Sequence, residues 1–334
     1  MGIRPLTASH RKGKSWAIIG GAGFIGSHFV DRLLADPNTG GVTVFDNFSS
    51  GQRWHLDGHS DDSRLEIVEG DAKDQSALVN TIEGRDTVIH LAANPDIARA
   101  ATQPAIDFDE GTALAQNVLE AIRRTGCGNL LYASGSGVYG DRGDARVREC
   151  DGPMEPISTY GASKLACEAL ISAYCHMFGL RACAFRFGNV VGPRQTHGVG
   201  YDFIRKLKAD PRRLDILGDG SQSKPYIHVN EIIEAVLLAD NRSGTGFNVF
   251  NVAPDDAVTV SEIAELSVTA MGLARGAVEL HYGSDSRGWK GDVPIVRLDC
   301  SRIGALGWSP RWNSREAVER SLSPLIEEME RRET

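Results

Sequence analysis

The sequence predicts a doubly wound parallel α/β sheet joined to a smaller mixed α/β lobe. Three observations support this prediction. In the first half of the chain, short apolar runs alternate with helical patterns, as in parallel strands joined by crossover helices. A glycine-rich turn directly follows the first apolar run. Beyond residue 189 the alternation becomes irregular, which indicates a second lobe with a different organisation.

The individual elements follow from residue patterns. Buried parallel strands are short and almost continuously apolar. The runs that fit this description are WAIIG (16–20), VTVFD (42–46), LEIVEGD (65–71), DTVIHLAA (86–93), NLLYAS (129–134) and RACAFRFGN (181–189). The last run is expected to close the sheet near Asn189. Helices are predicted at 23–36, 111–126 and 201–209, and Gly126 is typical of a residue that ends a helix.

Composition narrows the possible functions. The chain has 334 residues, of which 41% are hydrophobic and 24% charged, and its net charge is −8. This acidic balance argues against nucleic acid or an anionic membrane as the main partner, and no apolar run approaches the ~18–20 residues that a membrane span needs. The six cysteines are dispersed without a CxxC motif or a Cys/His cluster. They indicate reduced thiols, a cytoplasmic protein and no metal site.

A dinucleotide site is predicted at the glycine-rich turn. Gly20, Gly23 and Gly26 lie between an apolar run and a helical pattern. The first glycine permits a tight turn, the second lets the backbone approach a pyrophosphate, and the third lets the helix pack closely on the strand. Asp46 ends the next strand, where a carboxylate can bind both ribose hydroxyls of adenosine and repel the 2′-phosphate of NADP. The expected cofactor is therefore NAD.

Other cofactor contacts are expected along the same edge of the sheet. Aspartate at the end of the third run can contact adenine, and small residues at the end of the fourth allow a close approach. Each feature alone also fits simple packing. The residues expected to line the cofactor, besides those above, are Phe24, Ile25, Asp71, Ala72, Leu91, Ala92 and Ala93.

The chain is expected to divide into three parts. Residues 1–14 are basic but lack the apolar run of a signal peptide, which predicts a disordered tail. Residues 15–189 should form the NAD-binding Rossmann-type domain. Residues 190–334 should form the substrate-binding lobe, with some segments crossing back to the first domain.

Tyr160 and Lys164 form a candidate catalytic pair. They are four residues apart at the start of a helical pattern, so both side chains project from one helix face. A lysine ammonium beside a phenol favours the phenolate. The tyrosine can then act as a general base near neutral pH.

These motifs resemble the extended short-chain dehydrogenase/reductases, and specifically the NAD-dependent sugar-nucleotide epimerase/dehydratase family, with UDP-glucose 4-epimerase as the closest functional type. The resemblance extends from about Ser15 to Leu325. The segments that carry it are GGAGFIG, FDNFSSG, GDA, HLAAN, VYGD, YGASK, FRFGNVVGPR, LGDGSQSKPYIHVNE and LGWSP.

The resemblance implies roles for individual residues. Tyr160 is the expected catalytic base, and Lys164 the residue that binds the nicotinamide ribose and tunes the tyrosine. The residues expected around the adenosine ribose are Asp46, Asn47, Ser49, Ser50 and Gly51. The residues expected to face the diphosphate of the substrate are Asn189, Lys224 and Arg287. Lysine stands at position 224 where the family usually has arginine, and for Arg287 a solvent-exposed position is an open alternative.

One catalytic hydroxyl is missing from its usual place. The family usually has Ser or Thr three residues before the valine of VYG, where this chain has Gly135 between Ser134 and Ser136. Either serine could supply the hydroxyl, because a flexible glycine can redirect the backbone. A further departure is Gly111, where the family commonly has asparagine.

The predicted function is an NAD-dependent epimerase of a nucleoside-diphosphate sugar, acting through a transient 4-keto sugar. The resemblance also argues against a dehydratase or a decarboxylase, because family members with these activities generally have carboxylates in this loop, where this chain has Ser136 and Gly137. The alternatives left open are a net oxidoreductase or dehydratase on a related nucleotide sugar, and an NAD-binding scaffold with impaired catalysis. The resemblance also implies a homodimer joined through a four-helix bundle, to which helices near 111–124 and 160–178 would contribute.

Overall fold

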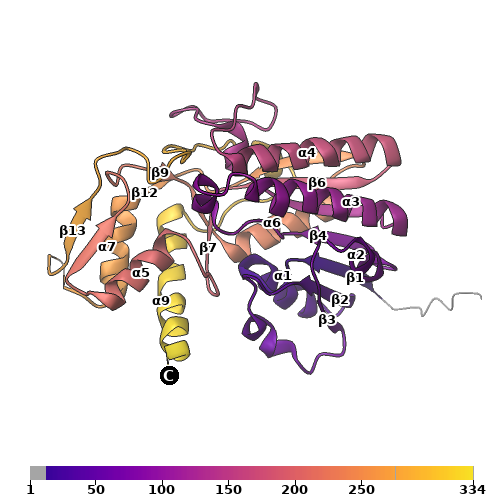
Figure 1. Ribbon diagram of the computed structural model, residues 1–334, viewed down its shortest axis with the longest axis horizontal. Helices are drawn as coiled ribbons and strands as arrows, with labels where there is room; N and C mark the ends of the chain where they lie inside the picture. Colours follow the sequence, from indigo (N-terminus) through magenta and orange to yellow (C-terminus); the bar gives the residue numbers. More distant parts are fainter. Residues whose placement is uncertain (1–12, 275, 334) are drawn as a thin grey trace, which may run out of the picture.

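A seven-stranded parallel sheet forms the centre of the first lobe (Figure 1). The computed structural model describes residues 13–274 and 276–333. The strands lie in the order β11-β6-β5-β4-β1-β2-β3. They are β1 (Lys14–Ile19), β2 (Thr39–Asp46), β3 (Leu65–Glu69), β4 (Thr87–His90), β5 (Asn129–Gly135), β6 (Arg181–Phe187) and β11 (Phe247–Val252).

The strand order reverses between β1 and β4, which confirms the doubly wound fold. In such sheets the chain leaves neighbouring strands in opposite directions at this point, and a crevice opens at their carboxyl ends. The glycine-rich turn after β1 and the loop after β4 both lie at this crevice. The helices of this lobe are α1 (Phe24–Leu34), α2 (Gln75–Ile82), α3 (Ala113–Thr125), α4 (Thr159–Phe178) and α6 (Val229–Arg242).

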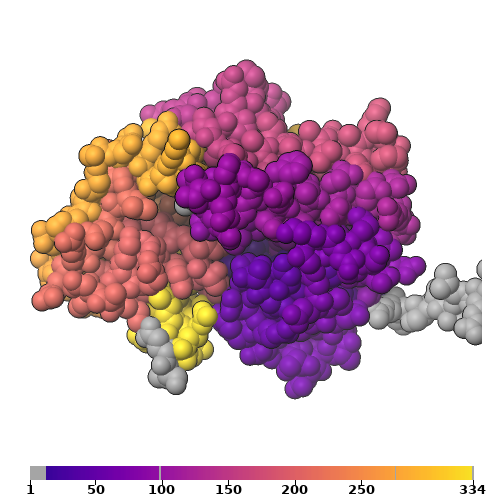
Figure 2. Space-filling view, viewed as in Figure 1, coloured from indigo at the N-terminus to yellow at the C-terminus, as the bar shows by residue number. Residues whose placement is uncertain are grey.

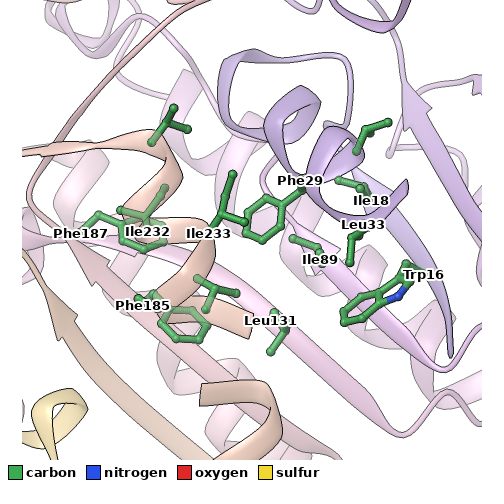
Figure 3. Close-up of a cluster of buried hydrophobic side chains, with 14 of the residues drawn as sticks. Trp16, Ile18, Phe29, Leu33, Ile89, Leu131, Phe185, Phe187, Ile232 and Ile233 are labelled. Carbon is green, nitrogen blue, oxygen red and sulfur yellow. The ribbon is translucent and has the colours of Figure 1, made fainter. Parts of the chain in front are cut away.

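Each face of the sheet has its own apolar core. Trp16 and Ile18 of β1 point to the face that α1 and α6 cover, where Phe29 and Ile232 pack against them and their neighbours (Figure 3). The alternate residues of the same strand point to the other face, which α2, α3 and α4 cover. Burial on both faces explains why the inner strands, such as β1 and β4, are almost continuously apolar in the sequence.

The second lobe has a separate core. Helices α5 (Val199–Ala209), α7 (Val260–Ala270) and α9 (Ser314–Glu333) enclose a cluster that includes Phe203 and Leu322. In Figure 1 these helices lie together on the left, away from the large sheet. The shorter elements, mostly of this lobe and the lobe junction, are β7 (Asn189–Val191), β8 (Arg213–Ile216), β9 (Ser223–Lys224), β10 (Tyr226–His228), β12 (Val258–Thr259), β13 (Glu279–Tyr282) and α8 (Ser301–Gly304).

Two expectations need correction. The strand at 181–187 does not close the sheet, because the chain returns from the second half and β11 pairs with β6 along its whole length. The expected tail at 1–14 lies mostly outside the described residues, but Lys14 already belongs to β1, where its ammonium pairs with buried Asp240. Within the described ranges, no helix is long and apolar enough to span a membrane.

Candidate active site

The glycine-rich turn has the geometry that a dinucleotide requires. Gly20 has a φ of +85°, and a Cβ atom built on it would lie 2.7 Å from the backbone nitrogen of Ala92. A Cβ on Gly26 would lie 2.7 Å from the Cα of Gly21, so only glycine allows this close approach of helix and strand. Gly23 is the N-cap of α1 and makes no side-chain cap there. The first N–H groups of the helix can therefore bind a phosphate.

The carboxylate of Asp46 is held at the end of β2. Its Oδ2 accepts a hydrogen bond from the backbone N–H of Ala22 at 2.9 Å, and its Oδ1 accepts one from Phe48 at 2.9 Å. Burial raises the pKa of Asp46, while these two hydrogen bonds act in the opposite direction. A Cβ on Gly51 would lie 2.7 Å from Oδ1, so the loop after β2 folds back tightly over the carboxylate. This arrangement fits a ribose with a free 2′-hydroxyl.

We expect the purified protein to contain NAD and not NADP. A 2′-phosphate would bring a second negative charge against the buried carboxylate of Asp46. Mass spectrometry of the nucleotide released by denaturation measures this directly. Asp46→Asn keeps the size of the side chain and removes its charge, so it should release NAD more readily and discriminate less between the two nucleotides. NADP as the main species from the wild type would contradict the prediction.

The other expected cofactor residues lie along the same edge. Asp71 does not end a strand, because β3 stops at Glu69; its Oδ1 accepts a hydrogen bond from the backbone N–H of Lys73. Leu91, Ala92 and Ala93 directly follow β4 in a segment that we call the cofactor loop, residues 91–96. In the loop after β2, Asn47 accepts a hydrogen bond from the N–H of Ser49, and Ser50 lines a cavity of about 500 Å³ that also includes Pro95 and Thr196.

Tyr160 and Lys164 lie in the first turns of α4, as the sequence predicts. Lys164 is only 5% exposed, and its ammonium donates a hydrogen bond to the carbonyl oxygen of Ala133 at 2.7 Å. The same ammonium lies 5.5 Å from the ring centre of Tyr160, which is partly exposed. The lysine is thus anchored to the end of β5 and places its charge beside the phenol.

A neutral histidine lies near this lysine. His90 ends β4 and is 1% exposed. Burial lowers the pKa of His90 to about 3, and the positive charge of Lys164 acts in the same direction. His90 is therefore neutral near pH 7, and the positive charge beside the phenol of Tyr160 comes from Lys164.

The loop from Ser134 to Tyr139 distinguishes between the two candidate serines. Ser134 is buried, and its hydroxyl donates a hydrogen bond of 2.5 Å to Oε1 of Glu168. Ser136 is partly exposed, and within the described residues its hydroxyl has no hydrogen-bond partner. Gly135 between them has a φ of −160° and is extended, so its backbone is one that any residue adopts.

The residues expected at the substrate diphosphate lie together at the junction of the lobes. Asn189 opens β7, and Lys224 of β9 pairs with the buried carboxylate of Asp292 at 2.5 Å. Arg287 bonds the carbonyl oxygen of Asp292 and pairs with Asp141 at 2.7 Å, so it is partly buried and not a free surface residue. Its side chain borders a cleft of about 640 Å³ whose lining also includes Ile157, Trp289 and Lys290. Figure 2 shows the surface indented where the two lobes meet.

Sequence reasoning missed the buried polar groups around this site. Glu168 is 3% exposed and pairs with Arg186, which is 2% exposed, at 2.6 Å. Glu168 stands four residues after Lys164, so helical spacing alone would have placed it on the face of the catalytic pair. Its partner on β6 carries no such signal. Among the described residues, no group of three or more histidine, cysteine, aspartate or glutamate side chains is arranged to hold a metal ion.

The sheet and its glycine-rich turn define an NAD-dependent enzyme, and the Tyr160–Lys164 pair lies next to the crevice of this sheet. The chain belongs to the NAD dependent epimerase/dehydratase family, whose sequence model matches residues 16–253.

Known relatives resemble the chain over almost its whole length. A crystal structure of a UDP-galactose 4-epimerase is 38% identical with a TM-score of 0.83, covering 94% of this chain and 99% of that one. The UDP-glucose 4-epimerase of Mycolicibacterium smegmatis is 32% identical over 312 residues, covering 91% of this chain and 96% of that protein. A dTDP-glucose 4,6-dehydratase from Streptomyces venezuelae, solved with NAD bound, is 26% identical with a TM-score of 0.85, covering 94% of this chain and 97% of that one.

Proposed function

We propose that this protein is an NAD-dependent 4-epimerase of a nucleoside-diphosphate sugar, similar to UDP-glucose 4-epimerase. The observation that supports this most directly is the position of Tyr160 beside Lys164, at the end of β5 and next to the crevice of a doubly wound sheet. The near full-length similarity to a UDP-galactose and a UDP-glucose 4-epimerase supports the substrate class.

The residues of the chain divide the chemistry between them. NAD, held by the glycine-rich turn and Asp46, would supply the hydride chemistry at C4 of the sugar. Tyr160 takes the proton from the 4-hydroxyl and later gives it back, and the ammonium of Lys164 stabilises the phenolate that this requires. Asn189, Lys224 and Arg287 bind the diphosphate end of the substrate at the lobe junction. Lysine at 224 supplies charge there but not the bidentate geometry of arginine.

A substrate panel tests the proposal. The protein is incubated with UDP-, GDP- and dTDP-sugars, and the products are identified by NMR. We expect conversion between sugars that differ only at C4, without net change in NADH absorbance. Net formation or loss of NADH would instead identify an oxidoreductase, and absence of any product from an NAD-loaded protein would favour the scaffold alternative.

The dehydratase alternative is supported by the similarity to a dTDP-glucose 4,6-dehydratase. Elimination of water needs an acid–base group besides the tyrosine. The loop before Val138 offers Ser136 and Gly137 and no carboxylate. A 4-keto-6-deoxy product in the panel would establish this reaction.

We propose Ser136 as the hydroxyl that assists Tyr160, because Ser134 is committed to Glu168. Ser136→Ala should lower kcat by about tenfold to a hundredfold, the range for losing a hydrogen bond with charge character. Ser134→Ala should lower mainly the free energy of unfolding. A Cβ on Gly135 meets no described atom within 4 Å, so Gly135→Ser should keep the melting temperature and a kcat at least equal to that of the wild type. Steady-state kinetics measure kcat for the three variants. A larger loss of kcat in Ser134→Ala than in Ser136→Ala would contradict the assignment.

We propose that the protein is a cytoplasmic homodimer. The compartment follows from the six cysteines, which are all free and so support a reducing environment. The dimer follows from α3 and α4, which lie side by side on one face of the molecule (Figure 1). At the end of α4, Met177 is 68% exposed and Phe178 is 48% exposed. Sedimentation should give twice the mass of the chain at micromolar concentration, and Met177→Glu should shift the distribution toward monomer. A monomer in the wild type would contradict the dimer.

A further inference from the structure

Asp107 is a buried carboxylate to which the proposed mechanism assigns no role. It is 1% exposed and directly precedes the π-helical turn η3 (Phe108–Thr112). Its Oδ1 accepts a hydrogen bond from Nδ2 of Asn94 at 2.8 Å, and its Oδ2 accepts one from the hydroxyl of Thr159 at 2.6 Å. Its backbone carbonyl accepts a third, from the hydroxyl of Ser163 at 2.6 Å. Two separate segments of the chain, the loop after β4 and the start of α4, therefore meet at Asp107.

Two of these donors directly precede the catalytic pair in the sequence. Thr159 comes immediately before Tyr160, and Ser163 comes immediately before Lys164. The side chain of Asp107 thus holds the start of α4, and its carbonyl holds the next turn of the same helix. A shift of α4 along or about its axis would break one or both hydrogen bonds.

The third donor belongs to the cofactor loop. Asn94 is 5% exposed, and its side chain makes two further hydrogen bonds, both to Asp96. Its Nδ2 donates to the carbonyl oxygen of Asp96, and its Oδ1 accepts from the backbone N–H of Asp96. Asn94 therefore shapes the cofactor loop and links it to Asp107. The catalytic pair and the loop that is expected to line the cofactor share one buried anchor.

The arrangement around Asp107 explains why glycine fits at position 111. A Cβ on Gly111 would overlap the hydroxyl of Ser163, closer than real side chains approach. That hydroxyl also bonds Thr112 at 2.9 Å. Glycine in η3 thus leaves room for the hydroxyl of Ser163 in the position where it bonds the carbonyl oxygen of Asp107. A departure from the usual family residue thus serves the contact between η3 and α4, at a π-helical turn of the kind often found at functional sites.

We propose that Asp107 is a positioning residue that fixes the distance between the catalytic pair and the cofactor loop. The inference rests on the proposed function, in which a proton and a hydride leave neighbouring atoms of one sugar. Such a reaction needs the base and the cofactor at a fixed separation, and a misplacement of about 1 Å can lower the rate by about a hundredfold.

Thr159 offers the sharpest test. The residue is exposed, so a substitution there disturbs little packing, and its contact with Asp107 is made through the hydroxyl. Thr159→Val keeps the shape of the side chain and removes the donor. We expect kcat to fall by about tenfold to a hundredfold with the substrate KM within about twofold of wild type. Thr159→Ser keeps the hydroxyl and should restore most of kcat. Thr43→Val removes a comparable bond of 3.0 Å to Glu66 on a distant strand, and it should leave kcat unchanged.

Amide hydrogen exchange gives a readout that needs no substrate. In the NAD-loaded protein, Thr159→Val should speed exchange by at least about threefold in the cofactor loop as well as at residues 158–164, because the anchor joins them. Asp107→Asn, which turns an amide N–H toward one of the two donors, should do the same. Wild-type kcat in Thr159→Val, or faster exchange confined to 158–164, would overturn the proposal. If the wild type converts no sugar in the panel, the proposed function fails, and the exchange data still decide whether Asp107 couples the two segments.

Discussion

Replacing Tyr160 with phenylalanine should lower kcat by about 10²–10⁴-fold while NAD stays bound. The change removes only the hydroxyl to which we assign the proton transfer, and general acid–base catalysis contributes a factor of that size. The ring, which lies beside the ammonium of Lys164, is preserved. Steady-state kinetics with the best sugar of the panel measure kcat, and absorbance of the released nucleotide measures the NAD content.

Lys164→Met separates the two roles assigned to the lysine. It removes both the charge beside Tyr160 and the hydrogen bond to Ala133, so activity and NAD retention should fall together, unlike in Tyr160→Phe. A Tyr160→Phe variant with near wild-type turnover would mean that another group is the base. A Lys164→Met variant with wild-type NAD content would remove the lysine from the proposed cofactor contacts.

Five strands of the large sheet, β1, β2, β4, β5 and β6, were predictable because burial on two faces leaves a nearly continuous apolar run. Strand β11 shows where this signal fails. Strand β11 has the sequence FNVFNV, and its Asn251 is fully buried. Asn251 donates hydrogen bonds to the carbonyl oxygens of Val147 and Asp299, and accepts one from the hydroxyl of Tyr139. A buried polar residue whose hydrogen-bond partners are distant in the sequence interrupts the apolar pattern, so this strand could not be recognised from local sequence.

The same limit applies to the candidate site. Tyr160 and Lys164 are four residues apart, and the three glycines of the turn are three residues apart. Such short spacings are visible in the sequence, and the structure places these residues at the start of α4 and in the turn after β1, as the spacings predict. The choice between Ser134 and Ser136 depends on Glu168, 34 residues beyond Ser134. The sequence raises that question but holds no local signal for the answer.

The largest loss of stability is expected from Glu168→Gln. Glu168 accepts hydrogen bonds from Nε and Nη2 of Arg186 at 3.0 and 2.6 Å, in addition to that of Ser134. Although burial alone would lower the pKa of Arg186, the carboxylate of Glu168 raises it. Without that carboxylate a guanidinium remains buried and uncompensated, so the free energy of unfolding should fall by about 3–5 kcal/mol. Urea unfolding followed by circular dichroism measures this change.

An exposed ion pair provides the matched control. Arg205 and Asp202 are 2.7 Å apart on α5, and the arginine side chain is 59% exposed. Arg205→Ala should lower the free energy of unfolding by at most about 1 kcal/mol. A loss of similar size in Glu168→Gln would show that the buried charge is not the dominant effect.

A double variant then separates stability from position. Replacing both Glu168 and Arg186 with methionine removes the two buried charges together, and such replacements are often neutral or stabilising. We therefore expect Glu168→Met/Arg186→Met to regain most of the stability that Glu168→Gln loses. Its kcat should match that of Ser134→Ala, because both changes remove the hydrogen bond between Ser134 and Glu168. A kcat well below that of Ser134→Ala would mean that the buried charges also position the 134–139 loop.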